Sequence, residues 1–353
     1  MTGTATATVA TSADHAEKRR RLLDVLDASG AEALALTGTT TLAWYLDGAR
    51  SHVSLAADPV LAVRVSRDAD EVLVTSNETS RLLREELPDW LTVRERPWYA
   101  GAPDLDALPE RAVADALLRA RSPLLPVETA RFAGLGADAA SALTDVMGAA
   151  EPSWTERRLA AEVARAVVDR GADPLVVLVG GEARADLPHP LPTDGPLGRR
   201  VLVVLCARRH GLVVNLSRAL AFGALDAAER DVQDRVLAVE RAAFDALVPG
   251  VPLSAVLEVI GEAYRAHGFG ADHWRGHHQG GVAGYAGRDP RATPDCDVRV
   301  AAGQAFAWNP WAPGGKVEDT VLLTDGGLDV LSADPRWPVT PVGGLARPVA
   351  WER

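Results

Sequence analysis

The stretch AFAWNPWAPGGKVEDTVLLTDGG, residues 305–327, decides how the C-terminal half of this chain folds. Apolar runs bounded by glycine and proline predict strands over 304–309 and 317–324, and the closing Asp-Gly-Gly predicts a hairpin turn. Glu318 falls on the second of these strands, beside a glycine-rich turn. An acid in this setting usually has a partner on the preceding strand, yet that strand ends in the neutral amide of Asn309.

The bulk composition narrows the class of protein. A chain of 353 residues with 47% hydrophobic residues is long enough for two domains that each bury a core. Its 48 acidic residues outnumber 37 basic ones, and no basic stripe stands out, so we expect no nucleic-acid partner. No run approaches the ~20 apolar residues of a membrane span, so we expect no membrane partner. Two cysteines make no disulfide framework, which favours a cytoplasmic location.

The order of predicted elements suggests a tail and two domains. Residues 1–13 are small and polar and are expected to be disordered. Strands alternate with helices over 14–150, which is typical of a small α/β domain. Ser153 and Glu156 form a capping-box pattern that predicts a helix start, and the second domain is placed at 151–353. The predicted fold class is therefore α/β (α+β).

Four stretches of the second domain carry polar groups in glycine- or proline-rich turns between apolar strands, which is the usual anatomy of a pocket. They are ARADLPHPLPTDGPL (183–197), VLCARRHGLVVNLSRALAFG (204–223), GHHQGGVAGYAGRD (276–289) and AWNPWAPGGKVEDT (307–320).

The order of these stretches resembles the creatinase, proline-specific aminopeptidase and methionine aminopeptidase superfamily. VEDTVLLTDGG is the most specific piece, and PHPLPTD and GHHQGG support it. The resemblance implies a pita-bread fold for the second domain. It implies more loosely that the first domain is the smaller creatinase-like N-terminal domain. It also implies a homodimer, because relatives with this N-terminal domain usually pair through it.

Metal-dependent members of the superfamily hold two divalent ions with two aspartates, one histidine and two glutamates. The motifs place these ligands, in order, at Val204, Asn215, His277, Asn309 and Glu318. Only the histidine and the last glutamate keep a ligand type. Two dications need several anionic oxygens to offset dehydration and mutual repulsion, so we expect no metal and no other cofactor.

Creatinase is a metal-free precedent in this superfamily, and it uses a histidine as proton shuttle. The resemblance places that histidine at His189. The YAGRD stretch that begins at Tyr285 also resembles creatinase. However, the two glutamates that grip the guanidinium of creatine correspond here to Ser217 and Asn309, so creatine itself is a poor candidate.

These considerations predict a metal-independent, creatinase-like enzyme, a hydrolase or lyase that acts near a C–N bond of a small amino-acid-like molecule. His189 would act as acid or base, with His277 and Glu318 orienting it or the substrate. The loss of anionic groups favours a neutral or carboxylate-bearing substrate. The predicted substrate-binding residues are Asn215, Ser217, Arg218, His278, Gln279, Tyr285, Arg288, Trp308, Asn309 and Lys316.

Other interpretations of the same residues stay open. His189 and His277 could be structural histidines, Trp308 could belong to the core, and Cys206 is best interpreted as a small buried hydrophobe. Arg218, Arg288 and Lys316 could be surface charges. The protein could instead be a metal-dependent Xaa-Pro dipeptidase or aminopeptidase. It could also be a non-catalytic pita-bread binding module.

Overall fold

The computed structural model describes residues 12–89, 91–101 and 104–353. Contacts group them into two compact units. The first comprises residues up to Arg131 together with His210–Leu212, and the second comprises Phe132–Arg209 and Val213–Arg353. The predicted tail lies outside the described residues except for Ser12 and Ala13, which belong to the first helix.

The first unit is a small α/β arrangement around one five-stranded sheet of order β4-β3-β2-β1-β5. Strand β2 pairs antiparallel with β1 and with β3, whereas β4 and β5 pair in parallel at the two edges. The strands are β1 (Ala33–Leu36), β2 (Leu61–Ser66), β3 (Asp70–Thr75), β4 (Thr92–Arg96) and β5 (Leu108–Pro109). The helices are α1 (Ser12–Ser29), α2 (Thr39–Tyr45), α3 (Thr79–Glu85) and α4 (Ala114–Arg121).

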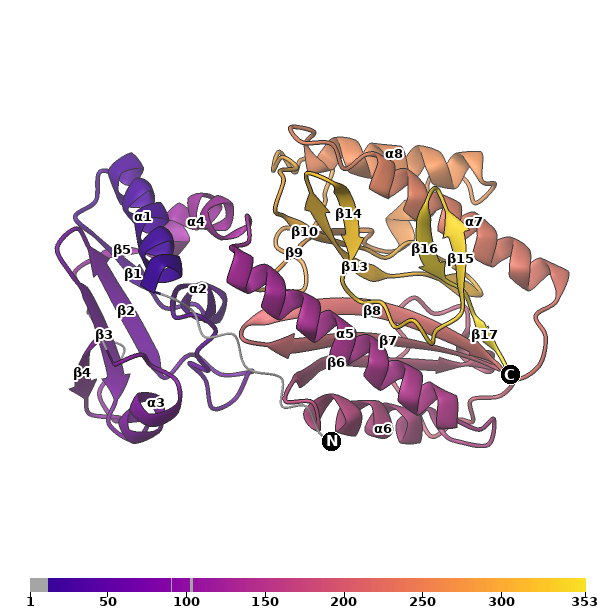
Figure 1. The fold of residues 1–353 in the computed structure, drawn as a ribbon, viewed down its shortest axis with the longest axis horizontal. Coiled ribbons are helices and arrows are strands. Elements are labelled where there is room, and N and C mark those ends of the chain that lie inside the picture. The colour runs from indigo at the N-terminus through magenta and orange to yellow at the C-terminus, as the bar shows by residue number, and fades with distance from the viewer. Residues whose placement is uncertain (1–11, 90, 102–103) are drawn as a thin grey trace. The chain divides into compact units, whose positions relative to one another are not determined.

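The second unit is built on two four-stranded sheets. The first, of order β17-β8-β7-β6, has helices α5 and α6 along it, as Figure 1 shows. Its strands are β6 (Asp173–Gly181), β7 (Arg200–Arg209), β8 (Leu212–Ala221) and β17 (Trp351–Glu352). The two helices are α5 (Pro126–Ala149) and α6 (Glu156–Val168).

The second sheet of this unit, of order β14-β13-β10-β9, is antiparallel throughout. Its strands are β9 (Gly280–Ala283), β10 (Ala305–Trp308), β13 (Asp319–Thr324) and β14 (Gly327–Val330). Helices α7 (Ala227–Asp245) and α8 (Leu253–Ala266) cover its outer face in Figure 1. The core between them is apolar because alternate strand residues such as Phe306 and Trp308 point the same way. The predicted hairpin turn is confirmed, since Thr324 pairs with Gly327.

Two short hairpins complete the unit. They are β11 (Trp311–Ala312) with β12 (Gly315–Lys316), and β15 (Val339–Val342) with β16 (Leu345–Pro348). The first hairpin carries Lys316 toward the polar residues described below. No helix among the residues described is both long enough and apolar enough to cross a membrane.

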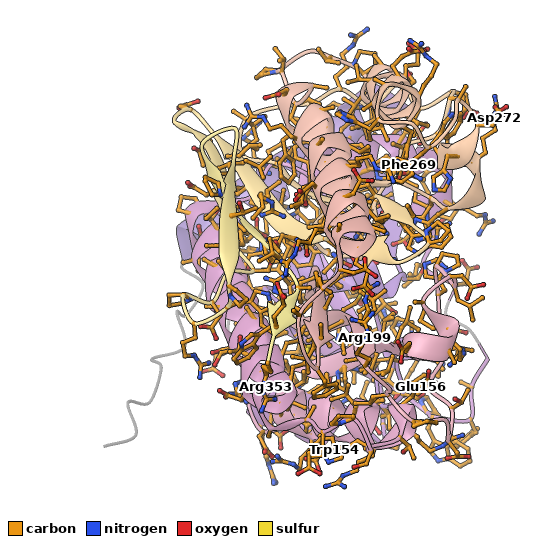
Figure 2. All side chains as sticks on the ribbon, turned by 90° about the vertical axis from the view of Figure 1, so that its right-hand side faces the viewer. Trp154, Glu156, Arg199, Phe269, Asp272 and Arg353 are labelled. Atoms are coloured by element: carbon orange, nitrogen blue, oxygen red, sulfur yellow. The ribbon has the colours of Figure 1, made fainter. Side chains whose placement is uncertain are left out.

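The start of helix α6 corrects the predicted capping box. The cap is Thr155, whose side chain accepts a hydrogen bond from the Arg158 backbone amide. Glu156, labelled with Trp154 in Figure 2, is 1% exposed and accepts hydrogen bonds from the backbone amides of Gly181 and Thr193. Glu156 thus fastens the loop before β7 instead of closing a capping box.

The two contact-defined units divide within helix α5, between Arg131 and Phe132. The predicted boundary near Glu151 falls instead at the end of this helix. Apolar residues of α5 such as Leu135 and Leu143 are fully buried, and they belong to the second unit. The assignment of 14–150 and 151–353 as domains stays a prediction.

Candidate active site

The two sheets of the second unit meet at Ser217 on β8 and Glu318 just before β13. These residues form an isolated β-bridge, in which the Ser217 amide donates to the Glu318 carbonyl over 3.0 Å. The Glu318 carboxylate is 2% exposed. Ser217 Oγ donates to one of its oxygens at 2.7 Å, and Arg288 donates to the other at 2.6 Å. Both oxygens of the one carboxylate at the centre are therefore engaged.

Arg288 reaches Glu318 from the loop that follows β9. That loop lies close to its neighbours because of Gly280 and Gly281, which have φ angles of +133° and +153°. A β-carbon on Gly280 would lie 2.3 Å from the carbonyl oxygen of Ala307, and one on Gly281 would lie 2.2 Å from that of Pro290. The two glycines of the GHHQGG stretch are thus required by backbone proximity.

Three histidines gather beside this ion pair. Nε2 of His277 lies 3.1 Å from Nε2 of His189, and the ring of His278 stacks on that of His277 with centroids 4.6 Å apart. His189 is exposed, whereas His277 is 7% exposed. Nδ1 of His277 and Nδ1 of His278 are buried without a hydrogen-bond partner in the described part of the chain. The sequence predicted this convergence from stretches nearly 90 residues apart.

Lys316 brings an amine into the same cluster. Its Nζ lies 3.3 Å from Nε2 of His277 and 3.3 Å from the carbonyl oxygen of Pro188. No carboxylate of the described residues lies within ion-pair distance of this amine, although Glu318 interacts with it electrostatically. Lys316 is therefore the cation of the cluster that lacks a direct counter-ion.

Burial and positive charge keep the imidazoles neutral. Burial, followed by the charge of Lys316, lowers the pKa of His277 to about 2. Burial and the charge of Arg288 lower the pKa of His278 to about 4. The pKa of His189 is lowered by burial and Lys316, against an opposing effect of Glu318. Burial also lowers the pKa of the Lys316 amine. A neutral imidazole at the surface can accept a proton at neutral pH.

The amide side chains around the cluster differ in what they leave free. Asn215 is 1% exposed, and its Nδ2 donates to the carbonyl oxygens of Val213 and Gly287. Gln279 is also engaged, with Tyr264 on its oxygen and the carbonyls of Trp274 and His277 on its nitrogen. Oδ1 of Asn309 is buried without a hydrogen-bond partner within the described ranges. Asn309 thus keeps a buried acceptor in reserve.

Two predicted binding residues point away from the histidines. Arg218 is 3% exposed and donates to Asp319 Oδ1 at 2.9 Å and to the carbonyl oxygens of Ser217 and Ser332. Trp308 is fully buried in the core beneath α7 and α8. Each directly adjoins another predicted binding residue, Ser217 or Asn309, on its strand, and Arg218 lines the cavity described below. Their role in substrate binding stays a prediction.

Three further residues are relevant to the histidine cluster, namely Tyr285, Cys206 and Arg291. Tyr285 is 6% exposed in the loop that carries Arg288. Burial raises the pKa of the Cys206 thiol to about 12, with a further contribution from Glu318, so this thiol stays protonated close to the site. Sequence reasoning missed Arg291, whose charge lowers the pKa of both His189 and His278. Arg291 lies two residues after the Gly-Arg-Asp triplet, and this proximity to Arg288 could have marked it as a residue of the site.

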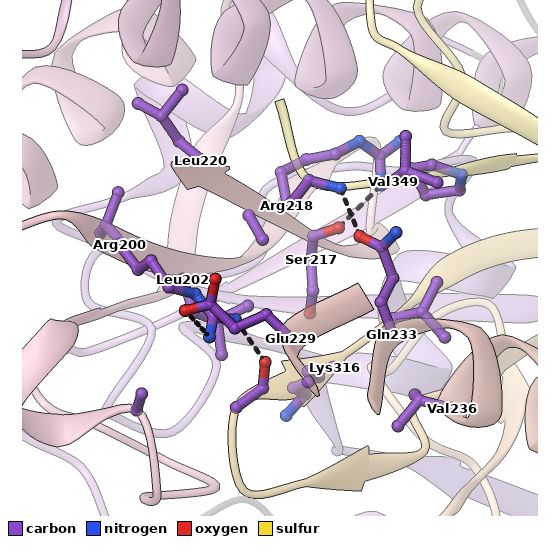
Figure 3. A pocket seen from close by; sticks show the side chains of 18 of the residues that line it. Arg200, Leu202, Ser217, Arg218, Leu220, Glu229, Gln233, Val236, Lys316 and Val349 are labelled. Atoms are coloured by element: carbon purple, nitrogen blue, oxygen red, sulfur yellow. Dashed lines mark hydrogen bonds and ion pairs between the residues drawn. The ribbon is translucent and has the colours of Figure 1, made fainter. Parts of the chain in front are cut away.

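A cavity of about 60 Å³ adjoins the cluster between β8, α7 and the first hairpin. Figure 3 shows Ser217 and Lys316 at this cavity, which they share with apolar side chains. The apolar lining includes Leu202, Ala219, Leu220, Leu225, Val236, Leu237 and Val349. Besides Ser217 and Lys316, its polar lining includes Arg218, Gln233 and the ion pair of Glu229 with Arg200 at 3.0 Å. The cavity is thus a mainly apolar space behind two polar residues of the site.

Comparison with known proteins places this geometry in a family. Residues 135–325 match the model of metallopeptidase family M24. The chain is 26% identical over 192 residues to the Xaa-Pro dipeptidase of Pyrococcus furiosus, and the match covers 51% of this chain and 54% of that relative. The chain therefore matches only about half the length of that relative.

Solved structures share the fold of most of this chain. The prolidase of Pyrococcus horikoshii has a TM-score of 0.75 at 17% identity, covering 91% of this chain and 99% of that one. The dipeptidase PepE of Mycobacterium ulcerans has a TM-score of 0.75 at 21% identity, covering 92% and 96%. The predicted α/β fold with a pita-bread domain is confirmed.

The residues at the positions where the resemblance implies the family's metal ligands do not fit two divalent ions. Val204 offers no ligand atom, and Asn215 donates its amide nitrogen to backbone carbonyls. Glu318 is already shared between Arg288 and Ser217. One carboxylate and one imidazole with a neighbouring amine cannot balance the charge of two dications.

Proposed function

The chain belongs to metallopeptidase family M24, and from that premise we propose that it is a metal-independent hydrolase or lyase. Its substrate would be a small, amino-acid-like molecule, neutral or bearing a carboxylate, with the reacting bond next to nitrogen. The single observation that carries this proposal is the contact of His189 and His277 beside Lys316. His189 is an accessible base, and Lys316 is a cation without a direct carboxylate partner among the described residues. Both contact His277.

We assign the acid–base step to His189. It is exposed and its pKa is lowered, so the neutral ring is available to take a proton from water or substrate. In a hydrolysis, water would add to the carbonyl carbon while His189 takes its proton. The same proton would then pass to the departing nitrogen as the C–N bond breaks. His277, held at 3.1 Å, would orient the ring of His189.

We assign the grip on a substrate carboxylate to Lys316. Burial disfavours its ammonium form, and a bound carboxylate would stabilise that form by supplying the missing counter-charge. Arg288 was the other predicted grip, but its guanidinium is committed to Glu318. Its proposed part is therefore to fix Glu318 and Ser217. Asn309, with a free acceptor, would receive a hydrogen bond from the substrate.

The test is a turnover screen with a metal control. Purified protein would be given Xaa-Pro dipeptides, N-acyl amino acids and N-carbamoyl amino acids, with products followed by mass spectrometry. We expect turnover of at least one carboxylate-bearing amide, unchanged by a chelator and lost in His189→Asn. Elemental analysis should find well under one metal equivalent.

The two alternatives give different results in the same screen. Turnover that a chelator abolishes and added metal restores would establish the metal-dependent Xaa-Pro dipeptidase instead. A compound that binds tightly but is never converted, with binding unchanged in His189→Asn, would favour the non-catalytic binding module. The saturated hydrogen bonds of Glu318 are the observation that supports this last possibility.

The predicted homodimer is a separate proposal, supported by the family resemblance. Light scattering at micromolar concentration should give twice the monomer mass of 37.3 kDa. A mass of one chain over that range would contradict it.

A further inference from the structure

Three imidazoles of the candidate site lie at distances that suit a metal ion. The ligand nitrogens of His189, His277 and His278 all lie within 4.8 Å of one another. The nearest pair is 3.1 Å apart. Zinc–nitrogen bonds of about 2.0–2.1 Å in a tetrahedron place two ligand nitrogens roughly 3.4 Å apart, so this spacing is of the right size. Neutral imidazole is also the protonation state that binds metals, and the cluster is held neutral.

The surroundings of the three rings nevertheless oppose a cation. Lys316 Nζ lies 3.3 Å from the same nitrogen of His277 that faces His189. The charges of Arg288 and Arg291 also act on the cluster. A divalent ion placed among the rings would meet Lys316 at contact distance and two guanidinium groups nearby. Glu318, the nearest carboxylate, is already neutralised by Arg288.

We infer that Lys316 keeps divalent metal out of a latent three-histidine site, and that removal of this one amine opens the site. The ligand set His189, His277 and His278 shares only His277 with the set that the family resemblance implies. The same amine that repels a metal ion attracts an anion, so the inference also explains how the cluster selects a carboxylate. It goes beyond the proposed function because it concerns binding alone and requires no turnover.

The charge of Lys316 is expected to weaken metal binding, and the size of this effect can be estimated. A single like charge within 4–6 Å commonly changes the binding of a proton by about 1–3 pKa units. A dication feels twice the repulsion that a proton feels. Replacing Lys316 by an apolar residue of similar length should therefore tighten metal binding by about a hundredfold or more.

The experiment is a cobalt titration followed by visible absorption, because Co²⁺ in a tetrahedral nitrogen site absorbs far more strongly than hydrated Co²⁺. Wild-type protein and Lys316→Arg, which keeps the charge, should show no such band at micromolar Co²⁺. Lys316→Met should bind one equivalent and develop the band. The double variant with Lys316→Met and His189→Asn should lose it, which would identify the ligands as the histidine cluster.

Two results would overturn the inference. One is stoichiometric cobalt binding by the wild-type protein or by Lys316→Arg. The other is a folded Lys316→Met that binds no tighter than wild type. Far-ultraviolet circular dichroism and a thermal melt would verify folding, and Lys316→Gln provides a second neutral variant if the methionine variant aggregates. Because no turnover is measured, the result is independent of whether the proposed enzymatic activity is found.

Discussion

Glu318 and Asp319 are consecutive carboxylates with opposite surroundings. Glu318 faces the histidines and shares Arg288 and Ser217. Asp319 faces the other side of the strand, where Arg218 and Arg347 each donate to it at 2.9 Å. Ser332 adds a hydrogen bond at 2.6 Å. Glu240 from α7 then pairs with Arg347, so two acids and two arginines form a closed network.

The difference lies in charge balance. In the Asp319 network, two positive and two negative side chains cancel, and each is at most 3% exposed. In the histidine cluster, Arg288 cancels Glu318 and Lys316 is left over, while the exposed Arg291 adds further positive charge. A balanced buried network fixes the strands, whereas a left-over cation in a partly open cluster is suited to a ligand that supplies the missing charge. We therefore expect the Asp319 side of this strand to stabilise the fold and the Glu318 side to contact a ligand.

The largest effect expected is on the balanced side. Arg347→Met leaves Asp319 and Glu240 buried without a shared partner, and should lower the free energy of unfolding by about 3–5 kcal/mol in urea denaturation. Arg265→Met is the control, because its pair with Glu262 on α8 is more than 60% exposed and should cost less than about 1 kcal/mol. Equal costs for the two variants would remove the distinction between network and surface pairs.

Sequence reasoning identified the elements of the recognition side but not its counterpart. The motif stretches placed His189, His277, Lys316 and Glu318 in one site, and the structure brings them together. The Asp319 network could not be predicted, because its partners Arg347 and Glu240 come from segments without a motif. Only the folded chain shows that these segments converge on the strand.

Strand geometry explains why two of the predicted binding residues point away from the histidines. Arg218 follows Ser217, and Trp308 precedes Asn309, so each predicted pair contains one residue on either face of its strand. A motif fixes which segment lies at the site, but a one-residue shift in interpretation reverses the side that a residue faces. The cavity was also missed. The motif stretches supply Ser217, Ala219 and Lys316, but the side that helix α7 closes, from Glu229 to Leu237, carries no motif.

The next effect concerns pH and sharpens the comparison on the histidine side. The pKa of His277 is about 2 in the fold, below its ordinary value of 6.5, so the unfolded chain binds its proton more readily. This contribution to stability is fully present above about pH 6.5 and declines as pH falls toward 2, by ~1.4 kcal/mol per pH unit. Between pH 6.5 and 4.5 it should amount to about 2–3 kcal/mol.

The measurement compares wild type with His277→Gln in urea at a series of pH values. The variant lacks this titration, so its stability should fall less steeply below pH 6.5. His278, whose pKa is lowered to about 4, should behave in the same way over the narrower range between pH 6.5 and 4. Parallel curves for wild type and His277→Gln would show that the His277 ring is not kept neutral by the fold.

A smaller effect of opposite sign is expected at Lys316. Arg347→Met is expected to destabilise the fold because it removes a partner of Asp319. Lys316→Met instead removes a buried amine that has no carboxylate within ion-pair distance among the described residues. It should raise the free energy of unfolding by about 1–2 kcal/mol while weakening the binding of carboxylate ligands. Lys316→Arg is the matched control, with the charge kept and no gain expected. Destabilisation by Lys316→Met would assign this lysine a structural role like that of Arg347.

The smallest effect lies at the cavity of about 60 Å³ behind Ser217, and it compares two alanines of strand β8. Ala219 lines the cavity, whereas Ala221, two residues on, is fully buried and does not. Filling empty space gains up to ~24 cal/mol per Å³, so Ala219→Val should raise the free energy of unfolding by at most about 1 kcal/mol. Ala221→Val forces extra methyl groups into a packed site and should cost about 1–3 kcal/mol.

If a substrate's apolar group enters the cavity, Ala219→Val should also weaken its binding, which isothermal titration with short and long N-acyl glycines would detect. Two variants with equal costs would show that the space beside Ser217 is filled in solution.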